Sequence, residues 1–193
     1  MSENQVLILV VVLVVAVIAV AAIVFVTGRK RRSAKLRERF GPEYDRVLQK
    51  EGDARKAEGV LEFREKRREK FALHPLSEAD KSSFDVRWRE VQSRFVDDPR
   101  GAVTVADGLV TEVMQKRGYP IGEFEQRAAD ISVDHPVVVE NYRAAHGIAL
   151  RHSSGQASTE DLRQAMVHYR ALFQELLDER QPQREPIPQR KGA

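Results

Sequence analysis

Histidines are the residues best suited to chemistry, and three of the five, His135, His146 and His152, lie close together in the sequence. Imidazole nitrogens bind metal ions and transfer protons near neutral pH. On a helix, His135 and His146 could share a face, but His152 would point away from them. The chain has no HExxH motif, so we predict neither a metal site nor a cofactor at these residues. An alternative function for this region is that of a signalling or ligand-sensing module with a small pocket near Asp134, His135 and His146.

Two pairs of acidic residues, Asp97-Asp98 and Glu160-Asp161, are the next candidates for chemistry. Both pairs stand at predicted helix starts, where the helix dipole favours negative charge, so we predict that they cap helices. Asp134-His135-Pro136 is read in the same way, as the start of another helix. The sequence also lacks a glycine-rich phosphate loop, a serine elbow and a nucleophile with an evident base. We therefore predict no catalytic residue and a protein that is not an enzyme.

Residues 6–26 contain only Val, Ile, Leu, Ala and Phe. As a helix they would be about 31 Å long, which matches a hydrocarbon core of about 30 Å. A cleavable signal peptide is the alternative, but it needs a basic start, and residues 1–5 contain neither Lys nor Arg. We predict a short N-terminal tail, 1–5, and a retained transmembrane helix, 6–26. The span has no polar, Gly or Pro residue, so it is predicted to be a passive tether.

The flank of this span indicates its orientation. Seven basic residues follow it closely, against one acid, Glu38: Arg29, Lys30, Arg31, Arg32, Lys35, Arg37 and Arg39. Because Lys and Arg near a span favour the cytoplasmic side, we predict a single-pass protein of the bacterial inner membrane with a cytoplasmic C-terminal domain. A periplasmic or secreted domain is the alternative. The absence of cysteine excludes disulfides and thiolate zinc sites and agrees with a reducing compartment.

Charge is distributed unevenly along the chain. Residues 1–73 carry 16 Lys and Arg against 10 Asp and Glu, whereas residues 74–180 carry 13 against 18. Binding to nucleic acid without sequence specificity relies on basic side chains that neutralise phosphates. The acidic C-terminal part is therefore predicted not to bind nucleic acid.

Residues 27–73 are predicted to be a basic helical connector. Gly41-Pro42 interrupts the first helix, Gly52 ends a second, and Asp53 caps a third that runs to about Phe71. The apolar stripe of this third helix continues through Arg64 and Arg68. We interpret the basic run 64–70 as a solvated helix surface; contact of the juxtamembrane segment with anionic lipid is the alternative.

Residues 74–180 are predicted to form a compact bundle of four or five helices, followed by a disordered tail, 181–193, rich in Pro, Gln and Arg. Ser77, Asp98 and Ser158 are the predicted N-caps, and Trp88 is a predicted core residue. Apolar residues recur at helical spacing and predict the buried faces. They are Phe84, Trp88, Val91 and Phe95; Ala102, Val103, Ala106, Leu109, Val110, Val113 and Met114; Phe124, Ala128 and Ile131; Val138, Tyr142, Ala145 and Ala149; and Leu162, Ala165, Met166, Tyr169, Leu172, Phe173, Leu176 and Leu177.

Several segments resemble a family of small bacterial single-span, membrane-anchored proteins, sometimes called secreted, for which no activity is known. They are FGPEYDRV (40–47), RFVDDPRGAV (94–103), VTEVMQKRGYP (110–120), FEQRAADISVDHPVVVENYRAAH (124–146) and ASTEDLRQAMVHYRALF (157–173). The resemblance implies a discrete domain tethered to a membrane and implies no site residue. Residues 144–155 are also similar to the phospho-accepting helix of histidine phosphotransfer domains, but Ala149 and Leu150 stand where that family has lysine and glycine.

The sequence as a whole favours a non-enzymatic, membrane-anchored module whose cytoplasmic bundle binds or scaffolds another protein. An apolar anchor, a basic connector and an acidic domain without a chemical motif fix where the chain resides and supply no reactive group. The predicted partners are the lipid bilayer and a protein.

Overall fold

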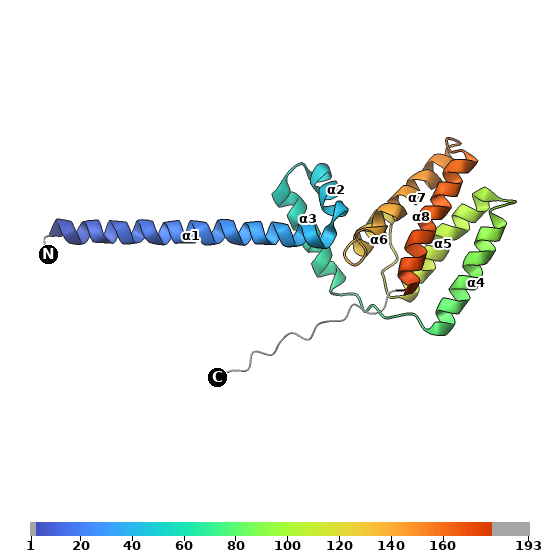
Figure 1. Ribbon diagram of the computed structural model, residues 1–193, viewed down its shortest axis with the longest axis horizontal. Coiled ribbons are helices and arrows are strands. Elements are labelled where there is room, and N and C mark those ends of the chain that lie inside the picture. The colour runs from blue at the N-terminus through green and yellow to red at the C-terminus, as the bar shows by residue number, and fades with distance from the viewer. Residues whose placement is uncertain (1–2, 179–193) are drawn as a thin grey trace. The chain divides into compact units, whose positions relative to one another are not determined.

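The computed structural model describes the backbone of residues 3–178 and, apart from residues 3–12, 14 and 15, their side chains. Within that range every regular element is a helix, which confirms the predicted all-α class. Figure 1 labels the helices: α1 (Glu3–Phe40), α2 (Pro42–Glu51), α3 (Ala54–Arg68), α4 (Glu78–Arg94), α5 (Pro99–Lys116), α6 (Phe124–Ile131), α7 (Val138–Ser153) and α8 (Thr159–Asp178). The predicted disordered tail, 181–193, lies outside the described residues, as do the first two residues of the predicted tail 1–5.

The chain divides into two compact units, Met1–Leu61 and Glu62–Ala193. The division falls inside α3, whereas the sequence placed the start of the domain at residue 74. Residues 62–73 therefore belong with the bundle and not with a spacer.

The first unit contains a small core of its own. Six apolar side chains from α1, α2 and α3 are buried: Leu36, Phe40, Tyr44, Val47, Ala57 and Leu61. Glu58 on α3 accepts hydrogen bonds from the hydroxyl groups of Ser33 and Tyr44. Residues 33–61 of the predicted connector are helical and form a small packed unit, because the turn at Gly41 lets these helices pack together.

The ends of α2 follow the sequence closely. Pro42 occupies the first turn, where its missing N–H removes no helical hydrogen bond. At the other end Gly52 adopts the left-handed conformation, with a φ of 68°, and donates its N–H to the carbonyl of Leu48 at 2.9 Å. Asp53 then accepts the backbone N–H of Lys56 at 2.9 Å, as predicted for the cap of α3.

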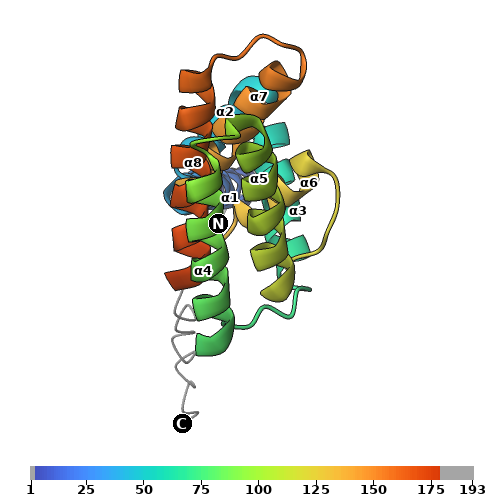
Figure 2. The ribbon, with the colours of Figure 1, turned by 90° about the vertical axis from the view of Figure 1, so that its right-hand side faces the viewer.

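The second unit is a helical bundle, as predicted. Helix α5 packs against α4 and α8, and α8 packs against α7 (Figure 2). The Trp88 indole on α4 stacks on the Phe173 ring of α8, with 4.6 Å between the ring centroids. All seven predicted residues of α5 and all eight of α8 are buried. A single apolar core joins α4, α5, α6, α7 and α8.

Helix α7 buries a face that differs from the prediction. Tyr142 and Ala145 are buried as expected, but Val139 and Ile148 replace Val138 and Ala149, which are partly buried. The two candidate stripes differ by one residue, and a period of 3.6 residues is compatible with either. Packing against α8 and α5 decides between them.

Side-chain caps begin α4, α5 and α8 at the predicted residues. Ser77 accepts the N–H of Asp80 at 3.1 Å, and Asp98 accepts that of Gly101 at 2.9 Å. Ser158 and Asp161 bond to each other's backbone N–H, at 3.2 and 2.8 Å, which makes a reciprocal capping box.

Gly118 ends α5 in a conformation that requires glycine. Its φ is 94°, and a Cβ built on it would lie 2.5 Å from the carbonyl oxygen of Ala72. The neighbouring Arg117 carbonyl accepts the N–H of His74 at 3.1 Å. This close approach holds the segment before α4 against the end of α5.

Candidate functional site

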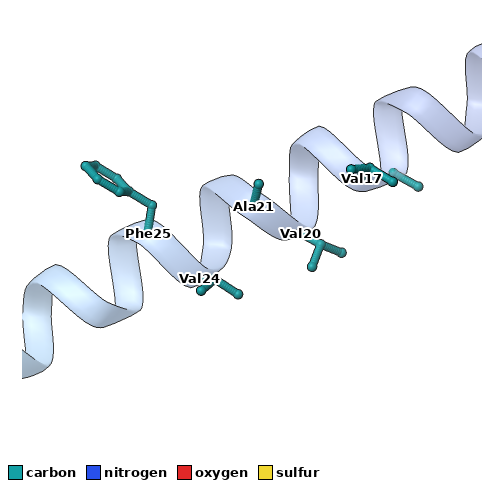
Figure 3. A pocket seen from close by; sticks show the side chains of 6 residues that line it. Val17, Val20, Ala21, Val24 and Phe25 are labelled. Carbon is teal, nitrogen blue, oxygen red and sulfur yellow. The ribbon is translucent and has the colours of Figure 1, made fainter.

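The apolar part of α1 is the largest exposed apolar feature of the described chain. A shallow groove runs along it, lined by Ala16, Val17, Val20, Ala21, Val24 and Phe25. Figure 3 shows five of these side chains projecting from the helix. The Phe25 side chain is 68% exposed. This surface is one face of a single helix and lacks the enclosed, polar-lined shape that small-molecule sites have.

Within the part of the chain whose side chains are described, no helix has the length and apolar character needed to cross a bilayer. The assignment of residues 6–26 as a transmembrane helix stays a prediction. The single helix that contains these residues runs from Glu3 to Phe40.

The basic run 64–70 is engaged by the bundle, so its interpretation as a solvated surface is wrong for its three arginines. Arg67 makes a bidentate ion pair with Asp130, at 2.8 and 3.3 Å. Arg68 pairs with Asp134, and Arg64 donates to the Ser132 hydroxyl at 3.0 Å. Arg64 and Arg68 lie on the same face of α3 as its apolar stripe. This face therefore makes apolar contacts in its first part and polar contacts at Arg64 and Arg68.

Asp130 is the buried carboxylate that pairs with Arg67. Its side chain is 1% exposed, and it also accepts a hydrogen bond from the Gln126 amide at 2.8 Å. A buried carboxylate without partners would destabilise the fold strongly. The Arg67 guanidinium offsets this cost by pairing with Asp130. The sequence offers no direct signal for this pair because 63 residues separate its members.

Asp134 and His135 do not cap α7, which corrects the prediction. Asp134 accepts a hydrogen bond from the Tyr119 hydroxyl at 2.9 Å in addition to its ion pair with Arg68. His135 is buried, with its Nδ1 3.2 Å from a carboxylate oxygen of Glu175. Val137 stands at the N-cap position without a side-chain bond. Both side chains bond instead to residues of α3, of α8 and of the segment after α5.

His146 lies in a different environment. Its ring stacks on Phe124 with 3.6 Å between centroids and an interplanar angle of 8°. Burial lowers the pKa of His146; Arg127 acts in the same direction, whereas Asp107 and Glu125 oppose the change. The structure therefore gives Asp134, His135 and His146 separate sets of partners, and the observed contacts do not favour a common ligand pocket.

A polar network beside His146 was missed from the sequence. The Tyr169 hydroxyl donates to Asp107 at 3.0 Å, and the Arg127 guanidinium donates to the Tyr142 hydroxyl at 3.0 Å. Both tyrosines are fully buried, and burial raises the pKa of each phenol. The apolar spacing of Tyr142 and Tyr169 identified them as core residues, but it carried no information about partners for their hydroxyl groups.

Among the described residues, no group of three or more His, Asp or Glu side chains is arranged to hold a metal ion. Three of the four paired acids act at helix starts: Asp98 caps α5, Asp161 accepts the N–H of Ser158 in the capping box of α8, and Glu160 pairs with Arg163. That hydrogen-bonded pair lowers the pKa of Glu160 to about 2. These contacts give Asp98, Glu160 and Asp161 structural roles.

The bundle has a small surface hollow between α4 and α5, with a volume of about 190 Å³. Val91, Val105 and Leu109 provide its apolar lining, together with three charged residues: Arg87, Glu90 and Arg94. Arg87 is paired with Glu112, and Arg94 with Asp98. The hollow could receive one apolar side chain of another molecule.

No protein-family model, no curated protein and no solved structure matches the chain. The resemblance to single-span bacterial proteins therefore stays a prediction.

Proposed function

We propose that this protein is a non-enzymatic, single-pass protein of the bacterial inner membrane whose cytoplasmic helical bundle binds or scaffolds another protein. The exposure of the apolar side chains of α1 carries the proposal. Burying a Val, Ile or Phe side chain contributes roughly 1.5–3 kcal/mol, so a helix of such residues is poorly suited to water. A bilayer would remove all of them from water at once.

The proposed orientation follows from the residues after the apolar run. Arg29, Lys30 and Arg31 are exposed and stand directly beyond it. The bias of Lys and Arg toward the cytoplasmic side supports a cytoplasmic bundle and an N-terminus outside.

The interaction role rests on the chemistry of the bundle. Three of its acidic and histidine side chains are engaged in intrachain contacts: Asp130 and Asp134 pair with arginines of α3, and His135 contacts Glu175. The hollow between α4 and α5 offers an apolar recess with charged residues around it, which is a common design for receiving an anchor side chain of a partner.

Membrane anchoring is tested with the triple variant Val17→Asp, Val20→Asp, Val24→Asp. An aspartate at the centre of a span opposes insertion by about 3 kcal/mol, and one nearer the end by less, so we expect the three together to release the chain from the carbonate-resistant membrane fraction. Val86→Asp, Val96→Asp, Val167→Asp is the matched control, because these valines are exposed on the bundle. Equal membrane retention of both triple variants would contradict the anchor.

Orientation is tested by labelling with an impermeant thiol reagent in intact cells. The chain has no cysteine, so Ser2→Cys and Ser154→Cys each introduce a single thiol. We expect labelling at position 2 alone. Labelling at position 154 alone would place the bundle outside and would contradict the proposed location.

The binding role is tested with a photo-crosslinking amino acid at Val105, in the hollow, and at Val167 on α8 as the control site. We expect a discrete protein adduct from position 105 and none from position 167. Adducts with lipid only, or none at either position, would contradict a protein-binding role for the hollow.

A further inference from the structure

The basic residues of the segment 27–73 include two sets with different surroundings. Arg64, Arg67 and Arg68 on α3 are engaged with Ser132, Asp130 and Asp134 of the bundle. On α1, by contrast, Arg29, Lys30, Arg31 and Lys35 are exposed. Contact with an anionic surface is therefore available to the α1 set, whereas the α3 set already has carboxylate or hydroxyl partners.

The exposed set surrounds the helix. Successive residues of an α-helix are rotated by about 100°, so Arg29, Lys30 and Arg31 project toward three different sides. A protein groove or a nucleic-acid backbone would contact one side of the helix. A ring of charge suits a medium that surrounds the helix.

The position of this ring is bounded on both sides. Before it, the Thr27 hydroxyl donates back to the carbonyl of Ile23 at 2.7 Å, so no polar side chain is left unsatisfied at the end of the apolar run. After it, Leu36 is buried in the core of the first unit. From Arg29 to Lys35 the helix rises by about 9 Å along its axis. The polar headgroup region of one leaflet is about 5–8 Å thick, which is a similar depth.

We infer that Arg29, Lys30, Arg31 and Lys35 form a collar that binds the headgroups of anionic phospholipids around the anchor. The inference rests on the proposed membrane anchoring and adds to it a preference for one lipid class. Ammonium and guanidinium groups at the membrane surface bind phosphate oxygens and gain from the negative surface potential.

The experiment uses the full chain with Phe25→Trp. It is reconstituted in mixed vesicles of phosphatidylglycerol and phosphatidylcholine in which one of the two lipids is brominated. Brominated acyl chains quench the emission of an indole that lies in lipid. Trp88, which is 5% exposed in the bundle core, supplies an emission that lipid does not reach. We expect phosphatidylglycerol to be favoured over phosphatidylcholine at the helix by about fivefold, the factor that one favourable basic contact near the surface provides.

The deciding variant replaces the collar: Arg29→Gln, Lys30→Gln, Arg31→Gln, Lys35→Gln. Its lipid preference should fall to about one. The matched control removes the same charge from other exposed positions, Lys50→Gln, Arg55→Gln, Lys56→Gln, Lys66→Gln, and should keep the preference.

The outcomes separate the two proposals. Absence of quenching by either lipid would contradict the membrane anchor and the collar together. Equal quenching by both lipids would leave the anchor in place and overturn the collar. A preference that persists in the collar variant would also overturn it.

Discussion

Helices α1 and α8 are both long and rich in apolar residues, but they place those residues differently. In α8, eight apolar side chains form one buried stripe against the rest of the bundle. In α1, the side chains of residues 16–26 are exposed on every side. A striped helix can bury its apolar face against its own chain, whereas a helix that is apolar all round needs a surrounding apolar medium. The comparison shows that α8 buries its apolar face within its own chain, whereas the apolar side chains of α1 stay exposed, which is the basis of the proposed membrane anchoring.

Replacing one aromatic residue by alanine in each region should give the largest difference in the free energy of unfolding. Trp88→Ala removes a buried ring that stacks on Phe173 and should lower the free energy of unfolding by about 3–5 kcal/mol. Phe25→Ala, on exposed α1, should change it by less than about 0.5 kcal/mol. Urea unfolding of the full chain in detergent, followed by far-ultraviolet circular dichroism, measures both. Equal effects would show that α1 is part of the cooperative core.

Arginine substitutions sharpen the comparison between engaged and exposed charge. Arg67→Gln leaves the buried Asp130 carboxylate with Gln126 as its remaining described donor and should reduce stability by about 1–3 kcal/mol. Arg31→Gln on α1 should be close to neutral in the same unfolding measurement, because this side chain is exposed. If Arg67→Gln were also neutral, the contact between α3 and the bundle would contribute nothing to stability.

Two adjacent acids at the start of α5 test a smaller contribution within the bundle. Asp98→Ala removes the side chain that accepts the N–H of Gly101 and should lower the free energy of unfolding by about 1 kcal/mol. Asp97→Ala is the control, since this neighbour is exposed and Asp98 supplies the cap. Thermal unfolding of the two variants should differ by a few degrees, and identical curves would contradict the cap.

The smallest expected effect is a pH dependence at His146. Because burial lowers its pKa below the usual 6.5, the unfolded chain takes up a proton at a higher pH than the folded chain. Its contribution to stability is therefore present above about pH 6.5 and is lost as the pH falls through the lower pKa of the folded state. The unfolding free energy of the natural chain should decline over that window, and His146→Gln should flatten the decline. His74→Gln, at an exposed histidine, is the matched control.

Local features of this fold could be predicted because their causes are local. Ser77, Asp98 and Ser158 cap their own helices, and Gly52 ends α2, since each bonds to backbone a few residues away. The stripes of α5 and α8 were correct in every residue because a helix with one polar face has only one face to bury. These features depend on the chain within about one or two turns.

Tertiary packing decided what the arginines, the acids and the histidines do. The basic run of α3 reads as a solvated surface until Asp130 and Asp134, more than 60 residues away, are brought to it. Asp134 has the form of a helix cap, yet Tyr119 and Arg68 hold it elsewhere. The buried face of α7 was likewise settled by the helices beside it. The sequence by itself determined the caps of α4, α5 and α8 and the buried faces of α5 and α8. Only the fold could choose the partners of charged groups, because long side chains form equally good contacts with many distant residues.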